Sequence, residues 1–416
     1  MDAKPRQAFN ARNATSQVPA PLVGLRVALV HDWLTGLRGG EKCLEVLCRA
    51  FPGATLHTLI HKKGSVGPTI GAMMIRTSPL QRLPGVERHY RKLLPIMPAA
   101  ARFWNVGEVD LVVSLSHCVA KAVRVPKGVP HVCYCFTPMR YAWDGRAAYL
   151  ESWTGRPVRR AAAGFMLDRL RAWDKATSSS VSHFVAISET VRGRIDRCYG
   201  RDGRVIEPPV DTSFYSPAPV DRDGPYLCVS ALVPYKRIDQ AIQVCSSTGR
   251  PLVVIGAGPD RDRLQRLAGP GVTFLGWQTD ESIRDHYRRC RALLFPGEED
   301  FGIVPAEAMA CGAPVIALAR GGAAETVDER AGVLYQEPTA DGLRDAIESW
   351  EHRGRPHDPA WARQRAEVYA LPRFRERLLN YLADVVGGSA AHKAPPAPHV
   401  LSGSLAPRGR GDQKAR

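Results

Sequence analysis

The sequence predicts an α/β protein made of two doubly wound domains, each a mainly parallel sheet covered by helices. Three observations lead to this prediction. Short β-branched runs alternate with helical patterns along most of the chain. The alternation starts twice, once near Leu25 and again near Tyr226. A chain of 416 residues is also too long for one ordinary hydrophobic core and suits two domains with tails.

The first domain is predicted over residues 22–206. It opens with the apolar run 25–30, a glycine-containing loop that ends at Gly40, and a helical pattern over 41–50. This order of strand, glycine loop and helix is typical of the first unit of a nucleotide-binding fold. Ser188 is a predicted N-cap for a helix that starts at Glu189. Further buried strands are predicted at 111–115, 131–135 and 183–187.

The second domain is predicted over residues 222–365, after a Pro- and Ser-rich linker at 207–221 that lacks periodicity. A helix within 366–387 is predicted to cross back onto the first domain. Residues 1–21 and the basic stretch 388–416 are predicted to be disordered tails, since the latter cannot bury enough apolar surface to order itself. The predicted strands of this domain are 226–229, 252–255, 272–275, 292–295 and 314–317.

The composition excludes several classes of protein. No run reaches the roughly 18 apolar residues that span a bilayer, and the first twenty residues lack a secretory signal, so a cytoplasmic location is expected. The ten cysteines show neither a C-x2-C pair nor a His/Cys cluster, which favours reduced core thiols over disulfides or zinc.

The net charge of +16 is unevenly distributed. Residues 76–102 mix arginines with large apolar residues, which suits a surface that meets anionic lipid headgroups and would make the protein peripheral on the inner face of the membrane. A solvated helix whose apolar side is core explains the same pattern, and both interpretations stay open. No nucleic-acid-binding motif is present, so no nucleic-acid partner is expected.

The strongest local signal is the segment 299–307, EDFGIVPAE, which directly follows a predicted strand. Pro305 fits the first turn of a helix. Glu299 on the loop and Glu307 on the helix would then bracket a helix N-terminus, whose free N–H groups attract a diphosphate while carboxylates accept bonds from sugar hydroxyls. A surface loop with two incidental acids is the alternative. The backbone donors expected here belong to Phe301, Gly302, Ile303 and Val304.

Four weaker signals follow other predicted strands. Lys236 and Arg237 place two cations at the start of a helix, where they could bind phosphate. A solvated helix end would show the same residues. The turn at Gly258 and the Gly321–Gly322 pair suit a close approach of backbone to ligand. His117, just past the strand 111–115, is either structural or a hydrogen-bond partner of a reacting sugar.

Together these residues resemble glycosyltransferase family 4, the retaining enzymes of the GT-B fold. The segments VALVHDWL at 27–34, GGEK at 39–42, CFTPMRY at 135–141 and VPYKR at 233–237 look particularly like the bacterial mannosyltransferases of O-antigen and exopolysaccharide assembly. The resemblance covers residues 25–379 and implies two Rossmann-like domains that face each other across a cleft.

The resemblance also implies roles for single residues. Glu299 would hold the hydroxyls of the donor sugar, and Glu307 would hold the ribose. Lys236 would bind the diphosphate, helped by the N–H groups of 301–304 and by the Gly39–Gly40 loop. His117 would contact the sugar near its anomeric carbon, so that His117, Glu299 and Lys236 are the expected catalytic residues.

One position departs from the family pattern. Many members carry an arginine five residues before the lysine, and Ala231 stands there in this chain. Arg237 is the candidate replacement for this missing positive charge.

The implied activity is retaining, metal-independent transfer of a hexose in cell-surface polysaccharide synthesis. The nucleotide-sugar donor, with GDP-mannose favoured, is a co-substrate, and no cofactor is expected. The acceptor would be a glycan or a lipid-linked saccharide. The alternatives are a UDP-hexose-dependent transferase of the same fold, a sugar-nucleotide epimerase, and a non-catalytic scaffold that binds nucleotide-sugars.

Overall fold

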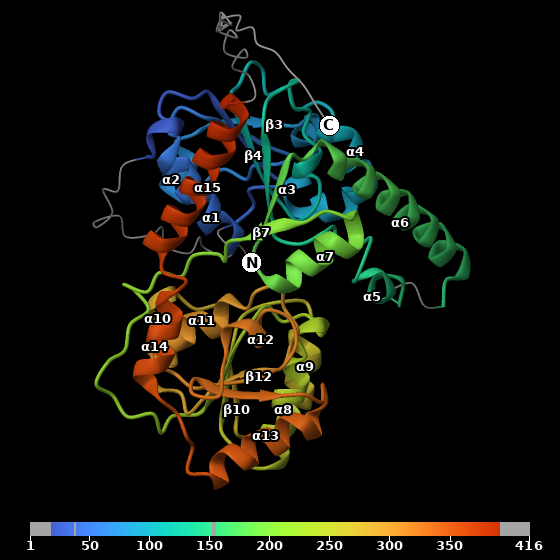
Figure 1. Cartoon of the computed structure of the whole chain (residues 1–416). Helices are drawn as coiled ribbons and strands as arrows, with labels where there is room; N and C mark the ends of the chain where they lie inside the picture. Colours follow the sequence, from blue (N-terminus) through green and yellow to red (C-terminus); the bar gives the residue numbers. More distant parts are fainter. Residues whose placement is uncertain (1–17, 37–38, 152–154, 392–416) are drawn as a thin grey trace, which may run out of the picture.

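The computed structural model describes residues 18–36, 39–151 and 155–391, which form two lobes (Figure 1). In the described part of the N-terminal lobe, seven parallel strands lie in the order β3-β2-β1-β4-β5-β6-β7. The predicted strand 131–135 has the same bounds in the structure, and the others agree within two residues. The strands are β1 (Val27–His31), β2 (Thr55–Thr58), β3 (Met74–Thr77), β4 (Leu111–Ser116), β5 (His131–Cys135), β6 (His183–Ala186) and β7 (Gly203–Val205).

The C-terminal lobe contains a second sheet, in which six described strands lie parallel in the order β10-β9-β8-β11-β12-β13. The predicted strands 226–229 and 252–255 have the same bounds in the structure. Each of the other three shifts by one residue at one or both ends. The strands are β8 (Tyr226–Val229), β9 (Leu252–Ile255), β10 (Val272–Gly276), β11 (Leu293–Phe295), β12 (Val315–Leu318) and β13 (Gly332–Tyr335).

Helices cover both sheets, and most lie between consecutive strands of the chain. The N-terminal lobe has η1 (Ala20–Leu22), α1 (Gly39–Ala50), α2 (Pro68–Gly71), η2 (Pro79–Arg82), α3 (Val86–His89), η3 (Tyr90–Ile96), α4 (Met97–Ala101), η4 (Ala120–Ala122), α5 (Arg146–Glu151), α6 (Pro157–Thr177), η5 (Ser178–Ser180) and α7 (Glu189–Tyr199). The C-terminal lobe has η6 (Pro234–Lys236), α8 (Ile238–Ser247), α9 (Arg261–Leu267), α10 (Asp280–Arg289), α11 (Ile303–Ala310), α12 (Ala323–Thr326) and α13 (Ala340–His352). The chain ends its described part with α14 (Pro359–Glu367) and α15 (Leu371–Ala391).

Both strand orders reverse direction at one point, between β1 and β4 in the first sheet and between β8 and β11 in the second. The crevice outside the carboxyl ends of such neighbouring strands is where doubly wound sheets bind ligands. The loop after β4 carries His117, and the loops after β8 and β11 carry Lys236 and Glu299. The topology therefore places all three predicted catalytic residues at switch points.

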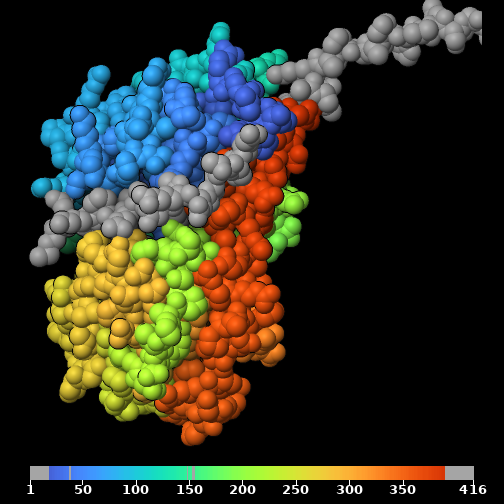
Figure 2. All heavy atoms as spheres, turned by 90° about the vertical axis from the view of Figure 1, so that its left-hand side faces the viewer, coloured from blue at the N-terminus to red at the C-terminus, as the bar shows by residue number. Residues whose placement is uncertain are grey.

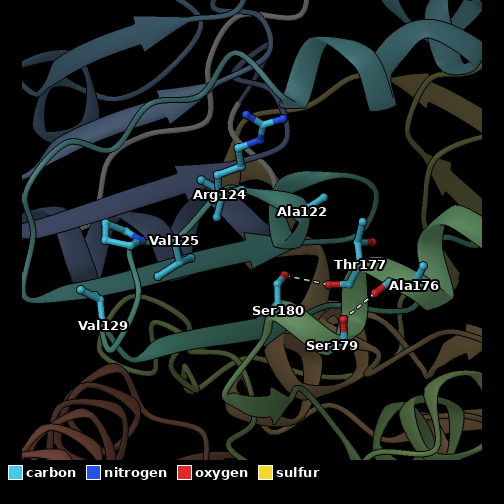
Figure 3. A pocket seen from close by; sticks show the side chains of 10 residues that line it. Ala122, Arg124, Val125, Val129, Ala176, Thr177, Ser179 and Ser180 are labelled. Atoms are coloured by element: carbon cyan, nitrogen blue, oxygen red, sulfur yellow. Dashed lines mark hydrogen bonds between the residues drawn. The ribbon is translucent and has the colours of Figure 1, made fainter.

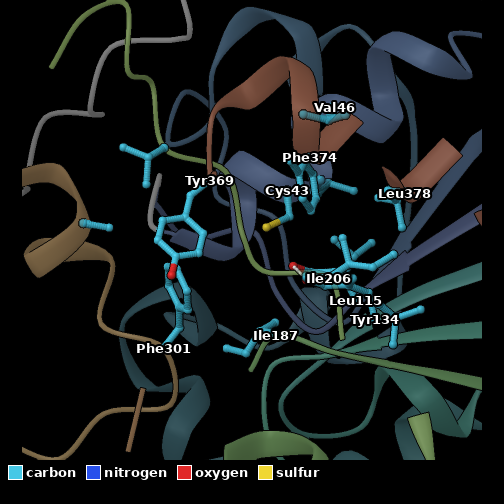
Figure 4. Close-up of a cluster of buried hydrophobic side chains, with 14 of the residues drawn as sticks. Cys43, Val46, Leu115, Tyr134, Ile187, Ile206, Phe301, Tyr369, Phe374 and Leu378 are labelled. Atoms are coloured by element: carbon cyan, nitrogen blue, oxygen red, sulfur yellow. Dashed lines mark hydrogen bonds between the residues drawn. The ribbon is translucent and has the colours of Figure 1, made fainter. Parts of the chain in front are cut away.

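The chain crosses back from the C-terminal lobe, where α14 lies, to the N-terminal lobe, where α15 lies (Figure 1). In the space-filling view, the orange-to-red end of the described chain runs over both lobes (Figure 2). Two backbone hydrogen bonds guide the crossing, from Val210 N to the Tyr369 carbonyl and from Leu371 N to the Val210 carbonyl. Phe374 then meets Tyr134 of β5, with ring centroids 5.9 Å apart. One continuous buried cluster joins the lobes at this place (Figure 4).

The predicted N-terminal tail is shorter in the structure than its predicted bounds of 1–21. Residues 1–17 lie outside the described part. Val18, however, packs against the core, and η1 lies against α15 with Leu22 buried. These two apolar side chains explain why the folded region starts before residue 22. Residues 388–391 of the predicted C-terminal tail belong to α15, which continues to Ala391, and the rest of that prediction, 392–416, lies outside the described residues.

The segment 76–102 has features of both interpretations of its sequence, because some of its large apolar residues are core and others are exposed. Leu80, Leu94 and Met97 are buried in the N-terminal core. Ile96, and Phe103 just beyond the segment, stay exposed, with 46% and 69% of their surface accessible. The exposed residues of this basic surface are Arg82, Leu83, Arg88, Arg91, Lys92, Ile96, Arg102 and Phe103.

Among the described helices, none combines the length and apolar composition that crossing a bilayer requires. All ten cysteines are buried and unpaired.

Candidate active site

Lys236 and Glu299 form an ion pair at the carboxyl edge of the second sheet. Lys236 is the last residue of η6, just after β8, and Glu299 lies on the loop after β11. Their side chains keep only 14% and 21% of their surface exposed. The loop approaches closely because Gly297 has no side chain: a Cβ there would lie 3.0 Å from the Lys236 Cα. The structure thus brings together the predicted lysine and the first predicted acid.

The helix α11 begins beside this pair and has no side-chain cap at its N-terminus. It starts at Ile303, earlier than predicted from Pro305, because Gly302 adopts the left-handed conformation (φ 83°) that lets the chain turn into the helix. Pro305 still lies in the first turn. The first N–H groups of a helix have no partner within it, so the start of α11 presents donors to a ligand.

The side chain of Phe301 anchors the loop instead of facing the cleft. It is 4% exposed, and its ring meets Tyr369 edge-on with centroids 5.1 Å apart (Figure 4). A predicted contribution of Phe301 to ligand binding can therefore come only from its backbone N–H.

Gly39 and Gly40, predicted as part of a loop, are the first two residues of α1 in the structure, and Gly39 faces the start of α11. A Cβ built on Gly39 would lie 3.9 Å from the Cδ1 of Ile303, and one on Gly40 would lie 3.1 Å from the Phe136 ring. The two glycines therefore lie where the lobes meet, as the predicted donor site requires.

Glu307 is fully buried and holds a cation that sequence reasoning did not identify. Lys42 Nζ, from α1 of the opposite lobe, lies 3.2 Å from the Glu307 Oε1, and the Tyr287 hydroxyl donates to Oε2 at 3.4 Å. Because the pair is buried, each charge depends on the other. A ribose could reach Glu307 only by sharing or replacing the contact with Lys42. Lys42 is part of the GGEK segment, which was the one available sequence signal.

His117 is held by a buried carboxylate, Asp32, at the end of β1. The His117 Nδ1 lies 3.0 Å from the Asp32 Oδ2. The same carboxylate accepts backbone N–H bonds from residues 117–120 at 2.6 to 2.9 Å. With Nδ1–H donating to Asp32, the Nε2 atom remains to face a ligand. Trp33 packs edge-on against the imidazole, with ring centroids 4.5 Å apart.

The Asp32 carboxyl is strongly acidic. Burial alone would raise its pKa, but the charge of His117 and its side-chain and backbone hydrogen bonds, together with the charge of His31, lower the pKa to about 2. Asp32 therefore stays ionised across the physiological range. Sequence reasoning did not select it as a functional residue, although a polar residue that directly follows a buried strand was the available signal.

His117 also lies near the glycines at the start of α1. Its ring centroid is 6.3 Å from that of Phe136, the residue that Gly40 contacts. Through Phe136 and Gly40, His117 is thus connected to the same junction of the lobes that contains the start of α11.

Two acids of the C-terminal lobe bind the N-terminal lobe across the cleft. Asp300 pairs with Arg140 at 2.6 Å and with Arg194, and its backbone carbonyl accepts the Ser188 hydroxyl at 2.5 Å. Ser188 at the same time caps α7, as predicted, by accepting the Val191 N–H.

Glu325 accepts both backbone N–H groups of residues 189 and 190, each at 2.8 Å. Glu325 lies on the short helix α12 and binds the first turn of α7, whereas Asp300 lies on a loop and contacts Ser188, the N-cap of α7, and Arg194 within it. Neither acid carried a functional assignment from the sequence, because their partners lie more than a hundred residues away.

Two predicted glycine sites have another explanation in the structure. Gly322 approaches the loop of Glu299, not an open space: its N–H donates to the Glu299 carbonyl at 2.8 Å, and a Cβ would lie 2.2 Å from the Phe301 Cα. Gly258 packs against Leu232, whose carbonyl would be 2.1 Å from an added Cβ. Backbone contact alone explains both glycines, so a direct role of Gly258 in binding a donor stays a prediction.

Arg237 points toward a different loop from Lys236. It adopts the left-handed conformation (φ 53°) and donates from Nη1 to the Pro338 carbonyl at 3.3 Å, beyond the end of β13. The suggestion that Arg237 replaces the arginine absent at Ala231 thus gains no support from its contacts.

A surface hollow on the N-terminal lobe lies away from this site, before the start of β5 and β6 (Figure 3). Its lining is mainly apolar, and its hydroxyls at Thr177, Ser179 and Ser180 donate to carbonyls of the preceding turn. Because it lies at the amino ends of the strands and holds no acid, it does not compete with the cleft as a candidate active site.

The family described as "Glycosyl transferases group 1" matches residues 214–367. A GDP-mannose-dependent alpha-(1-6)-phosphatidylinositol monomannoside mannosyltransferase of Mycolicibacterium smegmatis is 30% identical over 193 residues, which cover 39% of this chain and 50% of that protein. A D-inositol 3-phosphate glycosyltransferase of Mycobacteroides abscessus is 34% identical over 132 residues, 29% of this chain and 30% of the relative. The chain spans about half the length, or less, of these curated relatives.

Solved structures match nearly the whole described chain. The lipopolysaccharide outer core galactosyltransferase WaaB superposes with a TM-score of 0.61 at 15% identity, over 86% of this chain and 99% of that one. HepE of Anabaena, in complex with UDP and glucose, has a TM-score of 0.59 at 18% identity, over 86% and 99% of the two chains. At these identities the likeness shows the fold, two Rossmann-like domains in the GT-B arrangement.

Proposed function

We propose that this chain, a protein of the GT-B glycosyltransferase fold with a glycosyl transferases group 1 domain at residues 214–367, transfers a hexose from a nucleotide-sugar. The observation that carries the proposal is the Lys236–Glu299 pair beside the uncapped start of α11. A cation, a carboxylate and free helix N–H groups at a switch point are groups that bind the phosphates and hydroxyls of a sugar diphosphate.

We favour GDP-mannose as the donor and a glycan or lipid-linked saccharide as the acceptor, within cell-surface polysaccharide synthesis. Support comes from the name of the mycobacterial relative, which is GDP-mannose-dependent and acts on a phosphatidylinositol mannoside. A UDP-hexose is the second candidate, because HepE, a protein of the same fold, has been solved with UDP and glucose.

The proposed reaction retains the configuration of the anomeric carbon and needs no metal. The bond from C1 to the phosphate oxygen breaks, and its electron pair leaves with the diphosphate. Lys236 and the N–H groups of α11 stabilise this charge, which is the kind of interaction that contributes most to such catalysis. The acceptor oxygen bonds to C1 on the same face and gives its proton to the departing phosphate. Glu299 and His117 hold the sugar meanwhile.

A panel of donors tests the function directly. We expect GDP-mannose, or else one UDP-hexose, to raise the melting temperature, and nucleoside diphosphate to be released only when a saccharide acceptor is added. Conversion of the donor without an acceptor would instead indicate an epimerase. Binding without any turnover across lipid-linked and free acceptors would indicate a scaffold. Absence of binding by every nucleotide-sugar would contradict the proposal.

The stereochemistry is a separate prediction. Proton NMR of the first product should show the anomeric configuration of the donor, because donor and acceptor share one face of the sugar. Turnover should persist after treatment with EDTA. An inverted product would contradict the mechanism, and activity that EDTA abolishes and Mn²⁺ or Mg²⁺ restores would contradict metal independence.

We further propose that the basic surface of residues 82–103 meets an anionic membrane. The exposed Ile96 and Phe103 lie among five exposed cations, and burial of apolar side chains with attraction of cations to lipid charge is how interfacial proteins bind. We expect co-sedimentation with phosphatidylglycerol vesicles but not with phosphatidylcholine vesicles, weakened by salt. Replacing Ile96 and Phe103 with serine should reduce it. Replacing the exposed Val158 on α6 should not reduce co-sedimentation. Equal losses of vesicle binding in the two variants would contradict the assignment of membrane binding to this surface.

A further inference from the structure

The proposed donor site contains less positive charge than a nucleoside diphosphate requires. Lys236 shares its surroundings with three consecutive carboxylates, at residues 298–300, and is itself paired with Glu299. The neutral Ala231 stands where the resemblance leads one to expect an arginine. A diphosphate bound at the start of α11 would therefore need a second cation from elsewhere.

Two arginines near the site are already committed to other groups. Arg194 contacts Asp144 at 2.9 Å, Glu298 at 3.2 Å and also Asp300, and only 11% of its side chain is exposed. Arg237 donates to the carbonyl of Pro338. In both residues the guanidinium is already bound to another group, so neither is available to a diphosphate at the start of α11.

Arg140 differs from both in position and in its remaining donors. It belongs to the loop after β5 in the N-terminal lobe and reaches across the cleft, where its Nη2 donates to Asp300 at 2.6 Å. Its guanidinium lies 5.3 Å from the ring of Tyr235, the same ring that the Lys236 ammonium approaches to 5.3 Å.

The guanidinium of Arg140 has N–H donors that its contact with Asp300 does not use. Within the described residues, its Nε and Nη1 have no hydrogen-bond partner, and 32% of the side chain is exposed. Asp300, two residues before the N-cap Gly302, holds the guanidinium at the start of α11. An arginine presents its donors as a planar fork that suits phosphate oxygens.

We propose that Arg140 is the second cation of the diphosphate site and binds the donor from the lobe opposite Lys236. This inference rests on the proposed function. One aromatic ring, Tyr235, positions both cations, and Asp300 holds Arg140 in place before the donor arrives. Since the two cations come from different lobes, the bound diphosphate would add a link between the lobes to the Arg140–Asp300 pair.

Calorimetry on the full chain tests the proposal with GDP, UDP and the corresponding monophosphates. Arg140→Ala should weaken binding of the preferred diphosphate about 10- to 100-fold, the usual effect of losing one charge-assisted contact. Binding of the monophosphate should change little, because the second phosphate is missing. Arg140→Lys keeps the charge but not the planar set of N–H donors, so an intermediate loss of diphosphate affinity is expected. This variant also tests the proposal if the alanine variant does not fold.

Asp300→Asn separates binding from a purely structural role. If Arg140 only supported the loop through Asp300, both substitutions would weaken mono- and diphosphate alike and to the same degree, which would overturn the inference. A selective loss for the diphosphate in Arg140→Ala, larger than in Asp300→Asn, supports it. If wild-type chain binds a diphosphate and both Arg140 variants bind it equally well, only this inference fails. If wild-type chain binds no nucleotide, the proposed function fails with it.

Discussion

Replacing Lys236 with alanine should lower kcat by about 100- to 1,000-fold, as removal of one preorganised donor to developing charge does in other enzymes. The cause is loss of the cation that meets the leaving diphosphate at the start of α11. Substitution also leaves Glu299 without its ion-pair partner, so donor binding should weaken as well. Steady-state release of nucleoside diphosphate, with the donor panel established above, measures both effects.

Arg237→Ala is the matched control, since it removes a neighbouring cation that contacts the carbonyl of Pro338 instead. Its kcat should stay within a few-fold of wild type. Lys236→Arg should recover part of the activity, because the charge is kept. Near-normal turnover in Lys236→Ala, or equal losses at the two positions, would remove Lys236 from the reaction.

The fold was largely predictable because buried parallel strands leave a clear pattern in the sequence. Runs such as LVVSL and LVVI consist mostly of the Leu, Val and Ile residues that suit a strand covered on both faces. The boundaries shifted where conformation depends on one residue. The start of α11 is an example, because Gly302 enters a left-handed conformation that the neighbouring sequence does not disclose.

For the candidate site, the sequence predicted residues that directly follow strands but not the partners that these residues contact. Lys236, Glu299 and His117 each follow a strand, and the topology of a doubly wound sheet places such positions at one edge. The partners of these groups come from tertiary structure. Lys42 meets Glu307 across 265 residues of sequence, and Arg140 meets Asp300 across 160, separations at which no periodicity gives information.

The glycines illustrate a second limit of local sequence. Gly258 and Gly322 were interpreted as positions where backbone meets ligand, because a glycine after a strand suits both situations. In the structure each one meets backbone of its own chain, at Leu232 and Phe301. A sequence shows that a position needs space, but not which neighbour takes it.

Replacing Asp32 with alanine should cost about 3–5 kcal/mol of unfolding free energy, since it leaves four N–H groups, three of them buried, and the His117 side chain without their acceptor. Asp32→Asn should cost less, because an amide oxygen still accepts some of these bonds. Chemical denaturation at pH 7 measures both. Asp168→Asn, at an exposed ion pair on α6, is the control and should change stability little.

The pH dependence gives the same carboxylate a second test. The pKa of Asp32 is about 2 in the fold against an ordinary 3.8, so its stabilising effect is complete above that ordinary value and is lost as the pH falls toward 2. This shift corresponds to roughly 2 kcal/mol. Asp32→Asn should therefore flatten the decline in stability between pH 4 and pH 2. An unchanged acid profile would show that the Asp32 carboxylate does not stabilise the fold.

Asp32 should also affect turnover, through the orientation of His117. An asparagine can present its N–H₂ group to the His117 Nδ1, which would favour the tautomer that carries its proton on Nε2, the atom that faces the proposed sugar. His117→Ala should lower kcat with a smaller loss of stability than Asp32→Ala, because the backbone donors to Asp32 remain. If Asp32→Asn loses stability but keeps full turnover, Asp32 only supports the fold; if it loses turnover at unchanged donor affinity, it positions the histidine for the chemical step.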